Sequence, residues 1–103
     1  MSQTWHAVAA VTDVEPDYPL PVKVGDKKIA LYNIEGRIYA TDDICSHAYA
    51  RLSDGFVEDC YVSCPLHNAR FDVTTGQPVE GPATEPVEVI PVEIRDGQVF
   101  VSV

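Results

Sequence analysis

Two short stretches near the middle of the chain each carry one cysteine and one histidine. Cys45 and His47 form the first pair, and Cys64 and His67 form the second pair after sixteen intervening residues. Thiolate sulfur and imidazole nitrogen are common protein ligands of zinc and iron. The four residues therefore predict a metal site.

The distribution of these donors bears on which metal is bound. A structural zinc site of the Cys2His2 kind usually takes both cysteines from one motif and both histidines from another. A Rieske [2Fe-2S] centre has two cysteines on one iron and two histidines on the other, so two loops can each supply one ligand to each iron. The sequence has the second arrangement, although two such loops could also hold a single zinc ion.

A longer match surrounds both stretches. Residues 45–55 read CSHAYARLSDG, and residues 64–76 read CPLHNARFDVTTG. These runs resemble the Rieske-type [2Fe-2S] ferredoxin components of bacterial aromatic ring-hydroxylating dioxygenase systems, of the naphthalene and biphenyl dioxygenase kind. The resemblance covers the middle third of the chain in its motifs and the flanking segments only in their strand pattern.

The resemblance implies a site, a cofactor and a function. Cys45 and Cys64 would bind one iron of a single Rieske-type [2Fe-2S] cluster, and His47 and His67 would bind the other. The protein would be a one-electron carrier in aromatic hydrocarbon catabolism and not itself an enzyme. It would take electrons from an NAD(P)H-dependent flavoprotein ferredoxin reductase and pass them to the Rieske centre of a terminal aromatic ring-hydroxylating oxygenase.

Four positions near the ligands bear on the reduction potential. High-potential Rieske proteins carry a disulfide where this chain has Ala50 and Leu66, and hydroxyl donors to the cluster sulfurs where it has Ala69 and Phe71. Hydrogen bonds to the sulfurs raise the potential of such a cluster. The resemblance therefore implies a potential near the bottom of the Rieske range, which runs from roughly −150 to +300 mV.

Two alternatives stay open at this point. The same small fold serves as the small subunit of assimilatory nitrite reductases, some of which lack the cluster ligands, whereas all four ligands are present here. A zinc-stabilised binding module would keep both loops but would be colourless and without redox activity.

The remaining sequence predicts an all-β fold. No segment shows a sustained helical period, and β-branched and aromatic residues dominate the apolar runs. Turn residues at 24–27 and at Glu35-Gly36 indicate hairpins, and Asp96-Gly97 is a strong two-residue hairpin signal. Together with the resemblance, this predicts a Rieske-type antiparallel β-sandwich with two cluster-binding loops at one end, in a single domain of residues 1–103.

Local features are expected in the second half of the chain. Residues 78–86 hold three prolines and predict an irregular connection. The apolar positions change phase across Ile90-Pro91, which predicts a β-bulge at a residue that cannot donate to the ladder. Gly55 and Gly76 are expected in turns with positive φ.

Two further residues with metal-binding side chains are not expected to be ligands. Cys60 is predicted to be a semi-buried strand residue, because the ligand set is complete without it. His6 lies in the first predicted strand, residues 4–9, with no partner motif, so it is expected at the surface or at a sheet edge.

The charge balance restricts the partners. The 16 acidic and 7 basic residues give a net charge of −9, which disfavours nucleic acid and anionic membranes and favours transient encounters with basic protein patches. Asp42-Asp43, just before Cys45, is expected to take part in such encounters. The chain has no apolar run long enough for a membrane span and no signal-peptide pattern near its start. The expected protein is a cytoplasmic monomer.

Overall fold

The computed structural model describes residues 4–44, 51–64, 69–80 and 85–103. Within these residues the chain forms eleven strands and two short 3-10 turns, Val11–Asp13 and Leu52–Asp54, and no α-helix. The strands are β1 (Trp5–Ala10), β2 (Leu20–Val24), β3 (Lys27–Ile34), β4 (Arg37–Asp42), β5 (Val57–Glu58), β6 (Tyr61–Ser63), β7 (Arg70–Asp72), β8 (Pro78–Glu80), β9 (Val89–Ile90), β10 (Val92–Arg95) and β11 (Gln98–Ser102).

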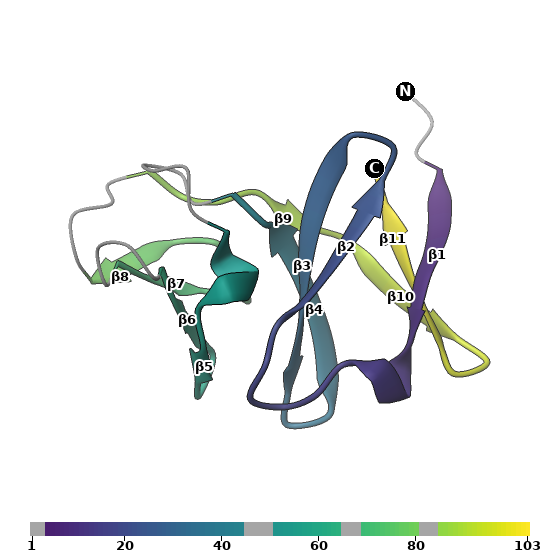
Figure 1. Ribbon diagram of the computed structural model, residues 1–103, viewed down its shortest axis with the longest axis horizontal. Helices are drawn as coiled ribbons and strands as arrows, with labels where there is room; N and C mark the ends of the chain where they lie inside the picture. The colour runs from purple at the N-terminus through teal and green to yellow at the C-terminus, as the bar shows by residue number, and fades with distance from the viewer. Residues whose placement is uncertain (1–3, 45–50, 65–68, 81–84) are drawn as a thin grey trace.

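The strands form three antiparallel sheets. A central sheet has the order β2-β3-β4-β9, a second sheet has the order β1-β11-β10, and a third has the order β5-β6-β7-β8. Figure 1 shows the central sheet between the other two, with β5 to β8 on the left and β1, β10 and β11 on the right. The predicted all-β fold with antiparallel sheets is confirmed.

The side chains of strand β3 pack on both faces of the central sheet. Ile29 and Leu31 belong to one buried cluster, and Ala30 and Tyr32 belong to another, as expected for a strand whose side chains alternate between faces. The Ile29 cluster packs against the β1-β11-β10 sheet through Val99. The cluster of Ala30 and Tyr32 reaches the third sheet, so one strand connects two separate hydrophobic cores.

The core on the side of the third sheet contains a hydrogen-bonded polar group. The hydroxyl of Tyr32 lies 2.9 Å from Oγ1 of Thr41, and the Thr41 hydroxyl donates to the carbonyl of Asp42 at 3.0 Å. The Tyr32 hydroxyl is therefore the donor in the first bond. Burial of Tyr32 raises the pKa of its phenol, because the charged phenolate would be taken out of water.

Two expectations for the C-terminal half are wrong. Residues 78–80 form strand β8, which pairs with β7, so the connection there is not irregular throughout. Instead of a bulge at Pro91, the chain changes sheets: β9 pairs with β4, whereas β10 pairs with β11. Proline suits this crossing because its nitrogen cannot donate to either ladder.

The predicted tight hairpins are confirmed. Asp96 and Gly97 have φ of 49° and 76°, and Glu35 and Gly36 have φ of 52° and 88°. Two consecutive residues with positive φ are typical of the type I′ turns that connect twisted strands. No helix among the described residues is long and apolar enough to cross a membrane.

Candidate metal centre

The structure describes one of the four predicted ligands. Cys64 follows strand β6 directly, whereas Cys45, His47 and His67 lie outside the described residues. The residues that flank each stretch are described, so the structure shows the support on which both ligand-bearing stretches are built.

Cys64 is completely buried, and its thiol is free of any disulfide. Its backbone N–H donates to the carbonyl of Ala69 at 2.7 Å. This bond joins the two ends of residues 65–68 and fixes Cys64 and Ala69 within one hydrophobic core. Their neighbours in that core include Leu52, Val62 and Phe71.

The first stretch is closed in a similar way. Ile44 and Arg51 form an antiparallel bridge, and the N–H of Leu52 donates to the carbonyl of Asp43 at 2.6 Å. Leu52 is fully buried in the same core as Cys64. The described residues that flank both stretches therefore lie at one core, as expected for two segments that share a metal centre.

Asp43 holds the base of the first stretch with its side chain. It is 2% exposed, and its two oxygens accept hydrogen bonds from the backbone N–H and the hydroxyl of Ser53, at 2.8 and 2.9 Å. Its own N–H donates to the carbonyl of Lys28 at 3.0 Å, which ties the segment to strand β3. A buried carboxylate is tolerated when its oxygens are hydrogen-bonded in this manner.

The proposed docking role of Asp42-Asp43 is thus wrong for Asp43, whose carboxylate is buried and engaged by Ser53. Asp42 is half-buried and lies 3.8 Å from the ammonium group of Lys27. The sequence carried a weak signal for the Asp43 clamp, since aspartate and serine often bond to nearby backbone. The sequence did not indicate that the hydrogen-bond partner of Asp43 would be Ser53, ten residues further along the chain.

Gly55 is required for a reason that the sequence did not reveal. Its φ is −86°, so the expectation of a positive φ is wrong. A Cβ atom at this position would instead overlap the backbone carbonyl of Ser63. The close approach places the segment after Leu52–Asp54 directly against the residue that precedes Cys64.

The turn after β7 is held by side-chain and backbone hydrogen bonds. The side chain of Asp72 accepts bonds from the N–H and the hydroxyl of Thr74, at 2.9 and 2.6 Å. Gly76 has a φ of +80°, as expected, and its carbonyl accepts a bond from the N–H of Val87 at 2.9 Å. This turn therefore connects the third sheet to the segment that leads into β9.

Cys60 and His6 are the two residues with metal-binding side chains that are not expected to be ligands. Cys60 is half-buried, as expected, but it lies in the turn between β5 and β6 and not in a strand. Its carbonyl accepts a bond from the N–H of Val73 at 2.9 Å. His6 is half-buried on β1, which is an edge strand of its sheet, so that expectation is confirmed.

The donor set fits a two-iron cluster. Each closed stretch contains one thiol and one imidazole, and the thiol that the structure describes is buried, unbonded and surrounded by apolar side chains. A thiolate is the required ligand form, and a dry apolar surround is typical of iron-sulfur sites whose potential the protein controls.

Known proteins are similar to this chain over nearly its whole length. The chain matches the family of Rieske [2Fe-2S] domains over residues 4–91. It is 46% identical over 99 residues to the anthranilate 1,2-dioxygenase ferredoxin subunit of Burkholderia cepacia, covering 96% of this chain and 92% of that protein. It is 41% identical over 102 residues to the ferredoxin component of the naphthalene 1,2-dioxygenase system of Pseudomonas aeruginosa, covering 99% and 98%.

Solved structures agree with this result. The ferredoxin of Sphingomonas yanoikuyae B1 superposes with a TM-score of 0.92 at 31% identity, covering 95% of this chain and 97% of that one. A ferredoxin-oxygenase complex of carbazole 1,9a-dioxygenase contains a chain that superposes with a TM-score of 0.90 at 37% identity, covering 98% and 94%.

Fold, donor set and similarity together place the chain in the Rieske [2Fe-2S] domain family, to which it belongs over most of its length. Within that family it is a ferredoxin, the electron-carrying component of a multicomponent aromatic ring-hydroxylating dioxygenase system and not the component that oxidises the substrate.

Proposed function

We propose that the chain carries single electrons from an NAD(P)H-dependent flavoprotein ferredoxin reductase to the Rieske centre of a terminal aromatic ring-hydroxylating oxygenase. The observation that carries this proposal is similarity to ferredoxin components over nearly the whole chain, at 46% and 41% identity. The oxygenase as partner is supported by one similar structure, which is described as a complex of reduced oxygenase and oxidized ferredoxin. The reductase is inferred from the multicomponent nature of such systems.

The same proposal assigns the ligands. Cys45 and Cys64 bind one iron, and His47 and His67 bind the other. Support comes from the pairing of one thiol with one imidazole in each stretch and from the buried, unbonded state of Cys64. When bound, the cluster supplies a site that gains and loses one electron.

The chain's own residues keep that site in one geometry. The bond from Cys64 to Ala69 and the bonds from Ser53 to Asp43 hold the ends of both stretches. Leu52 and Phe71 exclude water from the inner side. Because the ends of both stretches are hydrogen-bonded beside one buried core, we expect little of the protein to move when the charge of the site changes.

Iron and sulfide analysis, together with low-temperature EPR of the dithionite-reduced protein, tests the cofactor and its ligands. We expect two irons per chain and a rhombic signal with the low average g of mixed cysteine and histidine ligation. Cys64→Ser should lose the signal, whereas the control Cys60→Ser should keep it. A colourless protein that contains zinc would contradict the proposal and favour a zinc-stabilised module.

The partners are tested by reconstitution. We expect purified reductase and NADH or NADPH to reduce the protein, and the reduced protein to be reoxidised by a terminal oxygenase with its aromatic substrate. Failure of both half-reactions with intact cluster would contradict the carrier role. The small subunit of a nitrite reductase is also similar in fold, with a TM-score of 0.82, but at only 26% identity, so the carrier is favoured.

We also propose that residues 1–103 act as one domain and as a cytoplasmic monomer. The radius of gyration of the structure is 12.7 Å, against about 13 Å for a compact domain of 100 residues. Size-exclusion chromatography with light scattering should give a single species near the mass of one chain, 11.3 kDa. A species of twice that mass would contradict the monomer.

A further inference from the structure

Two lysines lie opposite each other on neighbouring strands without an acidic partner. Lys23 on β2 and Lys28 on β3 are register partners, and both are exposed. Side chains at opposed positions of an antiparallel pair are close neighbours, so two like charges there destabilise the sheet. Within the part of the chain that the structure describes, neither lysine forms an ion pair, although the protein has 16 acidic residues and only 7 basic ones.

Ordinary solubility does not explain the pair. Lysine is common on edge strands, where it prevents sheets from joining, and β2 is an edge strand. That reason accounts for Lys23 but not for Lys28, which lies on an inner strand. The other two basic residues at this end are paired: Lys27 with Asp42 and Glu88, and Arg51 with Asp54.

The two lysines border a groove beside the first ligand-bearing stretch. The groove has a volume of about 300 Å³ and is lined by Pro21, Val22, Lys23, Lys28, Asp43 and Arg51. Asp43 keeps its negative charge, because the donors of Ser53 that bond to it are neutral, but one carboxylate does not offset the three cations of the lining. The groove is thus a cationic site in an otherwise acidic protein.

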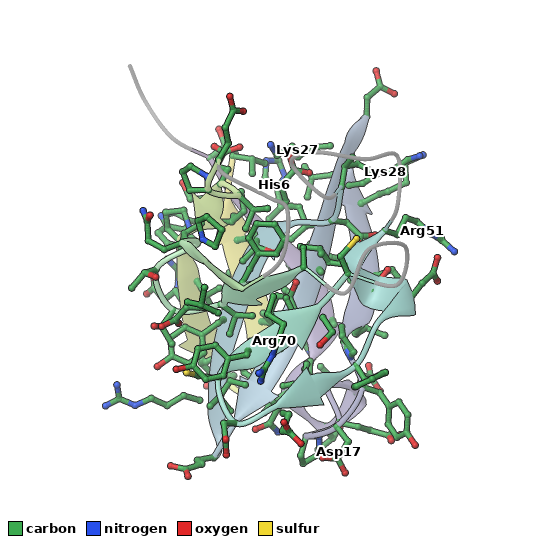
Figure 2. The ribbon with its side chains drawn as sticks, turned by 90° about the vertical axis from the view of Figure 1, so that its left-hand side faces the viewer. His6, Asp17, Lys27, Lys28, Arg51 and Arg70 are labelled. Carbon is green, nitrogen blue, oxygen red and sulfur yellow. The ribbon has the colours of Figure 1, made fainter. Side chains whose placement is uncertain are left out.

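The groove is directly connected to the base of that stretch. The carbonyl of Lys28 accepts the N–H of Asp43, and Arg51 forms the bridge with Ile44 that closes residues 45–50. Figure 2 shows Lys28 and Arg51 on the same side of the molecule, with Asp17 at the opposite end. Asp17 lines a separate cleft of about 630 Å³ together with Glu35, Glu58 and Asp59. The cleft that contains Asp17 is therefore acidic, whereas the cations Lys23, Lys28 and Arg51 outnumber the single carboxylate of Asp43 in the groove.

We propose that this cationic groove, defined by Lys23, Lys28 and Arg51, receives a carboxylate-bearing surface of a redox partner protein. This inference rests on the proposed carrier function and identifies one contact of its docking surface. An acidic partner surface would complement the two unpaired lysines and would bring the partner next to the first ligand-bearing stretch. It would be repelled by the acidic cleft at the other end, so the molecule would dock in one orientation.

The test is a pair of charge reversals measured by stopped-flow. Lys28→Glu replaces the like-charge pair by a Lys-Glu pair, so its melting temperature should stay the same or rise. The matched control Arg37→Glu makes the same charge change at the start of β4, in the same sheet. Second-order rate constants for reduction by the reductase and for reoxidation by the oxygenase are measured separately at low salt.

We expect Lys28→Glu to slow at least one half-reaction by about fivefold or more, while Arg37→Glu changes both by less than about twofold. Lys23→Gln should slow the same half-reaction to a smaller extent. Equal effects of Lys28→Glu and Arg37→Glu would show that only net charge matters and would overturn the proposal, as would no effect of either. Wild-type protein that reacts with neither partner would instead contradict the carrier function itself.

Discussion

The absence of a Cβ atom at Gly55 affects the placement of the predicted ligand Cys64. The backbone of Ser63 occupies the space in which any side chain at position 55 would begin. Ser63 immediately precedes Cys64, so a displaced Ser63 would move the thiol. Glycine is thus needed for a close approach of two segments, not for an unusual dihedral angle.

Gly55→Ala should destabilise the fold by about 3 kcal/mol, because backbone must shift to admit the methyl group. It should also lower the iron content of the purified protein. Urea unfolding and iron analysis measure the two effects. Gly36→Ala is the control: nothing lies within 4 Å of its Cβ position, so it should lose only about 1 kcal/mol from its positive φ. Equal losses in the two variants would contradict the steric argument.

Tyr32 gives the fold a dependence on alkaline pH. Its phenol is buried, and burial raises the phenol pKa above the ordinary value of 10.0. The folded protein therefore keeps the proton while the unfolded chain releases it near pH 10. The contribution to stability is complete below pH 10 and decreases as pH rises further, by about 1.4 kcal/mol per unit.

Tyr32→Phe should remove this part of the alkaline dependence. At pH 8 the variant should be less stable by about 1 kcal/mol, because the bond to Thr41 is lost. Above pH 10 the difference should shrink and then reverse. Urea unfolding at a series of pH values measures it, and parallel curves for the two proteins would refute the assignment.

Among the structural elements, the segment from Asp43 to Ser53 matters most for the centre. It is closed by the Ile44-Arg51 bridge, by the Leu52 to Asp43 bond and by two side-chain bonds from Ser53 to Asp43. The side-chain bonds connect the two ends of the segment independently of the ladder. Losing them should loosen the first stretch even if the sheets remain intact.

Asp43→Ala should lower the free energy of unfolding by about 2 to 3 kcal/mol, since two donors of Ser53 lose a charged acceptor. Ser53→Ala removes only the hydroxyl bond and should cost about 1 kcal/mol. The ratio of cluster absorbance to protein absorbance should fall in the same order. Asp43→Ala with wild-type stability and full cluster content would mean that the clamp has no role.

The elements differ in how far the sequence could predict them. Hairpins at Glu35-Gly36 and Asp96-Gly97 were predictable, because the turn itself demands residues that tolerate positive φ. The change of sheet at Pro91 could not be predicted. A β-bulge and a crossing between two sheets both shift the apolar positions by one residue, so the sequence pattern does not distinguish them. Strand β8 was hidden because prolines suit edge strands as well as irregular segments, and β8 is an edge.

The site was predictable to a similar degree. Residue types and spacing predict the four ligands, and for Cys45, His47 and His67, which lie outside the described residues, this stays a prediction. The clamp from Ser53 to Asp43 and the contact from Gly55 to Ser63 depend on distances between segments, and these follow from the fold and not from any local pattern. The charge pattern was misinterpreted for the same reason, since Asp43 is adjacent to Asp42 in sequence but buried in the structure.

At the scale of the whole molecule, the net charge of −9 combines with an uneven distribution. Four carboxylates, Asp17, Glu35, Glu58 and Asp59, line one cleft, whereas Lys23 and Lys28 line a separate groove and form no ion pair within the described residues. Such a molecule has an electric dipole as well as a net charge. Both act on a charged partner over a distance that depends on the ionic strength. Ionic strength should therefore control how fast the carrier meets its partners.

We expect the rate constant for electron transfer with a redox partner to fall as ionic strength rises. The Debye length shortens from about 30 Å at 0.01 M to about 8 Å at 0.15 M, so attraction between complementary surfaces is largely screened over this range. Stopped-flow measurements in sodium chloride and in potassium sulfate at equal ionic strength should give the same decrease, because screening does not depend on the identity of the salt. A rate that stays flat in both salts would mean that partners are found by shape and apolar contact alone, and a rate that rises would mean that the partner surface carries the same charge as the face it meets.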